Sequence, residues 1–246
     1  MPIVRILLVL LALASPALAQ DGARDTAAAR EAAQAFRVYV EGVAKTGGRP
    51  DLTRPEVAAL LGRIYDLDAL NALPPAQAND LDWLIDWVGA ANATFKVFTR
   101  YGSKSQSQPD LAALQVNMTE YEDQFAAAMN FMVRAQAREA VSIKLFWVGL
   151  APEQRTRVRE KGFTGARSSM AEWILEAVCS TTLSKPANVR LVAAAFRDTS
   201  DAWASFLLPK DRPRVIEGLA GYQKQVVDET ARTDLAAFAA ALQAVN

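Results

Sequence analysis

The sequence contains no histidine and a single cysteine among its 246 residues. The missing histidine excludes Ser-His and Cys-His nucleophile systems, His-ligated metals and His-ligated haem, because each of them needs an imidazole. One cysteine cannot form a disulfide within the chain. We expect this residue, Cys179, to be a small buried hydrophobic side chain, with an intermolecular disulfide as the alternative. The composition therefore predicts a protein with no cofactor and no metal.

Motifs that carry catalysis are also missing. The chain has no Ser-x-x-Lys dyad, no EF-hand loop, no haem attachment sequence and no phosphate-binding loop of the G-x-x-x-x-G-K-[ST] type. An enzyme built from this chain would have to rely on carboxylates, Tyr, Lys or Ser alone. We therefore expect a protein that is not an enzyme.

The chain has no excess of either charge and no strand signals. Its 27 basic residues are balanced by 27 acidic ones, which argues against nucleic acid or an anionic membrane as the main partner, since both attract a strong basic excess. Alternating runs of β-branched residues between tight turns are missing. Alanine, the residue with the highest helix propensity, is abundant. The sequence therefore predicts an all-α fold, a bundle of about eight or nine helices.

The first residues have the pattern of a secretory signal peptide. Arg5 precedes an apolar run over Ile6–Ala14, and the small residues of Ala17–Ala19 follow. The apolar run is shorter than the roughly 20 residues that a membrane span needs. We predict cleavage after Ala19, with residues 1–19 as the signal peptide and a periplasmic or secreted location. No later run is apolar enough to span a membrane, so the mature chain is expected to be soluble.

The mature chain divides at a polar stretch of small residues, 102–109. An N-terminal helical portion (20–101) precedes it and a C-terminal helical bundle (110–246) follows, and we expect the two to pack as one unit. Residues 110–149 carry a heptad-like apolar seam that Glu139 interrupts. They predict one long central helix, or two joined near Asn117–Glu120. Methionines on or next to the seam could adapt to a partner, but we expect them in the core.

One candidate site combines acids with tryptophans. Carboxylates accept hydrogen bonds from hydroxyl groups, and indole faces offer flat apolar platforms, so the combination suits a glycan. Two carboxylates one helical turn apart could also serve a glycan hydrolase as acid or base. The structural interpretation places the tryptophans in the core and the acids at the helix start. The candidate residues are Asp82, Asp86, Trp83 and Trp87.

A second candidate site is basic. Cationic residues surround 162–165, which the two glycines predict to be a loop, and a new helix is expected to begin near Ser168. Glycines, a helix N-terminus and arginines together favour anion binding. The structural interpretation is a solvated helix face, and because the two candidate sites have opposite sign they could also dock on each other. The candidate residues are Arg155, Arg157, Arg159, Lys161, Gly165, Arg167 and Ser168.

These observations predict an exported, non-catalytic helical protein that acts by binding. It would be an accessory or scaffold factor for another envelope or exported protein. The alternatives are a binding protein for a small glycan or anion and, less favoured, a carboxylate-dependent glycan hydrolase.

Overall fold

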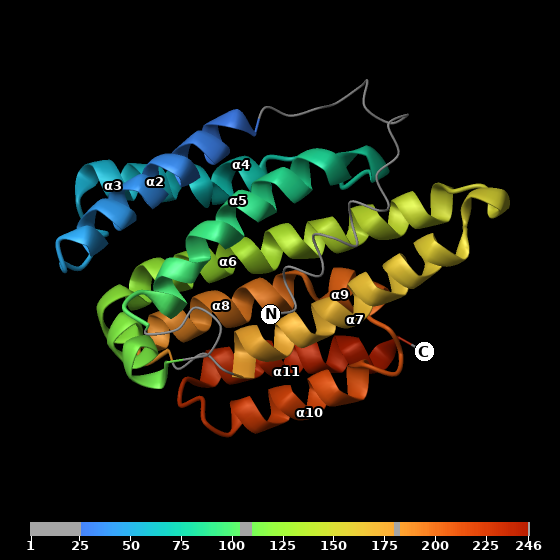
Figure 1. The fold of residues 1–246 in the computed structure, drawn as a ribbon. Coiled ribbons are helices and arrows are strands. Elements are labelled where there is room, and N and C mark those ends of the chain that lie inside the picture. The colour runs from blue at the N-terminus through green and yellow to red at the C-terminus, as the bar shows by residue number, and fades with distance from the viewer. Residues whose placement is uncertain (1–25, 104–109, 180–182, 246) are drawn as a thin grey trace.

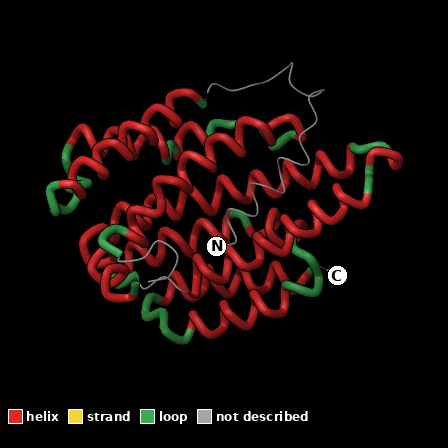
Figure 2. The backbone as a smooth tube through the Cα atoms, in the orientation of Figure 1, coloured by secondary structure: helices red, strands yellow, loops and turns green. Residues whose placement is uncertain are grey.

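The computed structural model describes residues 26–103, 110–179 and 183–245. The predicted signal peptide and most of the predicted linker lie outside the described residues. Within these ranges every regular element is helical and none is a strand (Figure 2). The predicted all-α bundle around one long central helix is confirmed.

The central helix is α6 (Leu111–Gly149), which is 39 residues long and runs through the middle of the molecule (Figure 1). It begins where Asp110 accepts a hydrogen bond from the backbone N–H of Ala113 at 3.1 Å, a side-chain N-cap. The backbone kinks at Tyr121, with φ of −115° and ψ of 19°. Of the two predicted arrangements, the structure thus shows a single run whose kink lies one residue beyond the predicted join.

An N-terminal layer covers one side of α6. Helix α5 packs along α6, and α2 packs on α5 and α3. Gly47, with φ of +69°, turns the chain just beyond the end of α2, where a residue with a Cβ atom would be strained. The elements of this layer are α2 (Ala27–Lys45), α3 (Pro55–Ile64), α4 (Leu67–Asn71), the 3-10 turn η2 (Ala78–Asp80) and α5 (Leu81–Arg100).

A C-terminal layer covers the other side. Helices α8 and α9 pack on α6, α11 packs on α8, and α10 packs on both α7 and α11. The elements of this layer are the 3-10 turn η3 (Pro152–Gln154), α7 (Arg157–Cys179), α8 (Pro186–Asp198), α9 (Ser200–Phe206), α10 (Arg212–Gln223) and α11 (Glu229–Ala244).

Two short breaks divide the end of the chain. It bends at Thr199, so that α8 and α9 are separate helices. Asp228 starts α11 after the break that follows α10, because its side chain accepts a hydrogen bond from the N–H of Ala231 at 2.9 Å.

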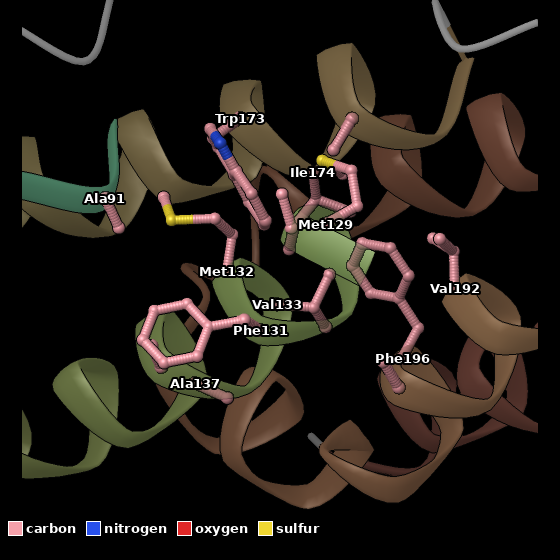
Figure 3. Packing of buried hydrophobic residues seen from close by; sticks show 14 of the residues in the cluster. Ala91, Met129, Phe131, Met132, Val133, Ala137, Trp173, Ile174, Val192 and Phe196 are labelled. Carbon is pink, nitrogen blue, oxygen red and sulfur yellow. The ribbon is translucent and has the colours of Figure 1, made fainter. Parts of the chain in front are cut away.

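The core is continuous across both layers. Figure 3 shows Met129 and Met132 of α6 among side chains of α7 and α8, including Trp173 and Phe196. Met118, Met129 and Met132 are all buried, so the methionines of the seam are core residues, as expected. Within the described ranges, α6 and its neighbours included, no helix combines the length and the apolar character that crossing a bilayer requires.

Candidate binding surfaces

The two tryptophans of the acidic candidate site face the core. Trp83 is 5% exposed and Trp87 is 7% exposed. The ring of Trp87 lies 5.2 Å from that of Phe131 in α6, and its Nε1 donates a hydrogen bond to the carbonyl oxygen of Ile64 at 2.9 Å. These contacts join α3, α5 and α6. The indole faces are therefore occupied by the protein's own packing, as the structural interpretation predicts.

The two acids point the other way. Asp82 and Asp86 are exposed, and Asp86 lies 3.5 Å from Arg30 of α2. Successive residues on a helix are about 100° apart, so neighbouring positions such as 82 and 83 lie on different faces. Nearby Asp80 turns inward, 2.6 Å from Arg138 of α6. The structure thus brings the carboxylates and the ring faces to different sides of α5.

The prediction of a loop at 162–165 is wrong, because α7 continues unbroken from Arg157 to Cys179. No helix starts at Ser168. Two glycines cost a helix roughly 1 kcal/mol each relative to alanine. Phe163 offsets this cost by stacking on Trp147 of α6, with ring centroids 4.8 Å apart. The geometry that favoured anion binding at 162–168 is therefore absent from this part of the described chain.

Arg167 and Ser168 attach α7 to the end of α9 and the start of α10. The Arg167 guanidinium donates hydrogen bonds to the carbonyl oxygens of Phe206 and Leu207, which lie at the C-terminus of α9. Burial lowers the pKa of Arg167 from its usual value, and nearby Arg212 lowers it further. Ser168 donates to a carboxylate oxygen of Asp211 at 2.8 Å. These contacts give Arg167 and Ser168 a structural role.

Gly165, the remaining residue of that segment, lies inside α7, and a Cβ atom added there meets nothing within 4 Å. The other four basic candidates, Arg155 to Lys161, lie where the chain turns from α6 into α7. Arg155 donates to the carbonyl oxygens of Val148 at 2.9 Å and Leu150 at 3.1 Å. Arg159 donates to that of Gln154 at 3.0 Å. We call residues 144–161 the α6–α7 tip.

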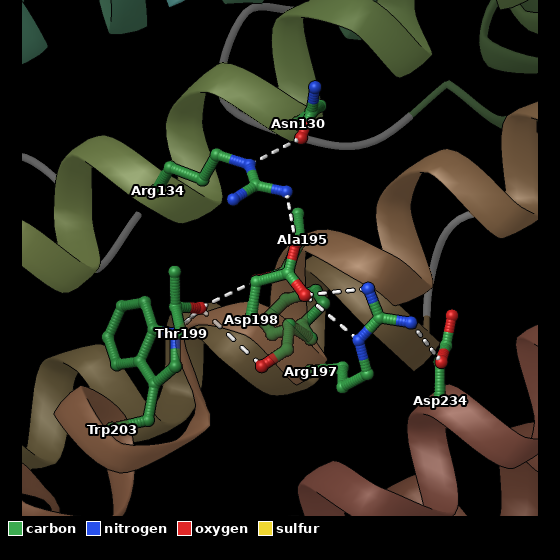
Figure 4. Close-up of polar contacts among 9 residues, drawn as sticks. Asn130, Arg134, Ala195, Arg197, Asp198, Thr199, Trp203 and Asp234 are labelled. Atoms are coloured by element: carbon green, nitrogen blue, oxygen red, sulfur yellow. Dashed lines mark hydrogen bonds and ion pairs between the residues drawn. The ribbon is translucent and has the colours of Figure 1, made fainter. Parts of the chain in front are cut away.

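A network of charges that the sequence did not indicate holds α8 between α6 and α11 (Figure 4). Arg134 of α6 pairs with Asp198 at 2.7 Å and also donates to Asn130 at 3.0 Å. Arg197 bridges Asp198 and Asp234 of α11, each at 2.7 Å. Every charge in this network has a partner of opposite sign, which indicates a structural role. Sequence spacing could not reveal it, because its members come from three helices.

A second network fastens the α2–α3 connection to the start of α6. Arg49 donates to Asn117 at 2.7 Å and pairs with Glu120. Its guanidinium lies 5.6 Å from the ring centroid of Tyr101 and 5.5 Å from that of Tyr121. Burial is the main reason that the pKa of Tyr121 rises to about 12. The cluster thus joins the α2–α3 loop, the end of α5 and α6.

Two acids of α6 are buried. Glu122 accepts hydrogen bonds from the backbone N–H groups of Ser184 and Lys185 and from the side chain of Asn188. These donors stand at the start of α8. Glu139 is 3% exposed, and its burial raises the pKa to about 7. Within the described residues no group of three or more His, Cys, Asp or Glu side chains is arranged to hold a metal ion.

The surface also carries an apolar groove between α2 and α5, with a volume of about 300 Å³. Arg30, Arg37 and Asp86 stand among its lining, and the apolar part of that lining comes from one stripe on each helix. The stripe residues are Ala33, Phe36 and Val40 on α2 and Ala90, Ala93 and Val97 on α5. The i, i+3, i+7 pattern of both stripes is visible in the sequence, but that the two stripes line one groove is not.

Comparison of the chain with protein-family models, with curated proteins and with solved structures gives no match.

Proposed function

We propose that this chain is an exported, non-catalytic protein that binds another envelope or exported protein as an accessory or scaffold factor. The observation that supports this proposal is the α2–α5 groove. Apart from the buried Phe36, the residues of its apolar stripes are partly or fully exposed. The tryptophans, the methionines of α6 and the charge networks are instead engaged in packing the fold. A partner that covers the groove would remove apolar surface from water.

The groove has the form that accepts a helix. Two neighbouring helices each present an apolar stripe, and alanines at positions 33, 90 and 93 leave room for a third backbone to approach. Peptide helices bind such grooves through apolar residues spaced three and four apart. Across the rim Arg30 pairs with Asp86 at 3.5 Å, and along it Arg37 pairs with Glu41 at 3.7 Å. An apolar centre with a polar rim is the usual anatomy of a protein interface.

Site-specific photo-crosslinking tests the proposal. A photoreactive residue placed at Ala93, which is exposed on α5, should give a discrete crosslinked product in the cells that produce the protein. The same residue at Ala237, exposed on α11, serves as the control. A product that depends on the groove position supports the proposal. Equal products at both positions, or none at either, would contradict it.

The glycan, anion and hydrolase alternatives stay predictions. The arrangement of α5, with its rings inward and its carboxylates outward, gives no specific support to a glycan site.

A further inference from the structure

The α6–α7 tip carries a local charge that the whole chain lacks. Residues 144–161 contain five basic side chains and two acidic ones, whereas the chain as a whole has equal numbers. Arg155 donates to carbonyl oxygens, which leaves its positive charge in place. Charges more than about 10 Å apart are largely screened at ordinary ionic strength. A surface that touches the tip therefore meets a basic patch.

The tip also exposes apolar side chains. Leu145 and Val148 lie three residues apart, on one face of α6. Leu145 is 42% exposed and Val148 is 63% exposed. Val158, near the start of α7, is 70% exposed. In Figure 1 the tip, drawn in yellow, projects beyond the other helices.

We propose that the α6–α7 tip docks on an anionic lipid surface, with its apolar side chains in the headgroup region and its basic side chains against lipid phosphates. Exposed apolar residues among Lys and Arg are the pattern of segments that lie in the membrane interface. The proposal concerns a different surface from the α2–α5 groove and does not depend on it. The positive charge of the tip favours anionic lipids over neutral ones.

The shape of the tip favours a lipid surface over a protein. A stable protein interface uses roughly 20–30 residues a side, more than the whole tip contains. A bilayer can accept a small projecting tip, since its headgroups rearrange around the inserted side chains. The balanced charge of the chain argues against an anionic membrane only when it is averaged over the entire molecule. The local excess at 144–161 reverses that expectation for this one surface.

Vesicle flotation tests the charge requirement. The mature protein should float with vesicles of phosphatidylcholine plus phosphatidylglycerol, stay behind with phosphatidylcholine alone, and dissociate as salt is added. Each Lys or Arg near an anionic bilayer is worth about fivefold in binding, so Arg157→Glu should weaken flotation at least that much. Arg232→Glu, at an exposed position on α11, is the matched control and should change little. Circular dichroism would confirm that both variants remain helical.

An environment-sensitive fluorophore tests the place of contact. In a Cys179→Ala background, the label is attached at Val158→Cys or, as the control, at Val227→Cys, since Val227 is 89% exposed outside the tip. Anionic vesicles should shift the emission of the label at 158 to the blue and leave that at 227 unchanged. Equal shifts, or no preference for anionic vesicles, would overturn the proposal. Binding to polyglutamate without binding to vesicles would also overturn it and assign the tip to an acidic protein.

Discussion

Glu122 and Glu139 are two buried acids of α6 whose surroundings drive their pKa values in opposite directions. Burial favours the neutral form of both. At Glu122 this effect is outweighed by hydrogen bonds from Ser184, Lys185 and Asn188, so its pKa falls below the usual value of 4.5. At Glu139 burial acts alone and raises the pKa from 4.5 to about 7. The sequence identified Glu139 only as a break in an apolar seam, since its burial depends on the neighbouring helices.

Glu139 should make the protein less stable as the pH rises from about 4.5 to about 7. In this window the unfolded chain loses the proton that the folded chain keeps, so the free energy of unfolding falls by about 3 kcal/mol. Glu139→Gln removes this pH dependence, so the variant should become more stable relative to the wild type as the pH rises through the same window. Urea unfolding at several pH values measures the difference. The exposed Glu217→Gln is the control, and a slope that survives in Glu139→Gln would contradict the assignment.

Glu122 should stabilise the start of α8. Replacing it with alanine removes the acceptor of several buried donors and should cost about 2–4 kcal/mol in the free energy of unfolding. The effect should be full above the usual carboxyl pKa and shrink as the pH falls, because protonation weakens the same contacts in the wild type. Asp123→Asn alters the neighbouring exposed acid, which pairs with Lys185 at 2.8 Å, and should cost less than about 1 kcal/mol. Similar losses of stability in the two variants would contradict a role of Glu122 in stabilising the start of α8.

At the scale of elements, the sequence predicts what depends on local chemistry. The length of α6 follows from an uninterrupted run of helix-forming residues, and its start follows from the capping residue Asp110. Its kink at Tyr121 lies one residue beyond the join that the sequence predicted. The glycines at 162 and 165 led to the wrong prediction of a loop, because their low helix propensity is a local property. The stack of Phe163 on Trp147, which stabilises α7 there, depends on the position of α6. Likewise the pattern identified Trp83 and Trp87 as either core or platform. Only the position of α6 decides between them.

Gly165→Ala tests whether α7 is continuous. A Cβ atom at this position meets open space, and alanine is favoured over glycine inside a helix. The variant should therefore gain roughly 0.5–1 kcal/mol in the free energy of unfolding. Gly47→Ala, where φ is +69°, is the matched control and should lose stability. Both are read from thermal and urea unfolding. A Gly165→Ala variant that is no more stable than the wild type would argue for a break in α7.

At the scale of the whole molecule, two averages over the sequence conceal local features. The charge balance conceals the basic tip, and an apolar content of 51% conceals the groove between α2 and α5. Both surfaces depend on how helices distant in sequence are placed. The candidate acids and bases were found because charge runs are visible in a sequence. The roles of Asp80, Asp86 and Arg167 emerged only once their partners on other helices were known.

Native mass spectrometry of the mature protein, isolated gently from the cells that make it, tests most directly whether the chain acts by binding a partner protein through the α2–α5 groove. The wild type should carry the added mass of a second polypeptide. Ala93→Glu, which places a charge on the groove, should release that polypeptide, while the control Ala237→Glu on α11 should retain it. A wild-type chain that is always bare, or a complex that survives Ala93→Glu as well as Ala237→Glu, would contradict the account.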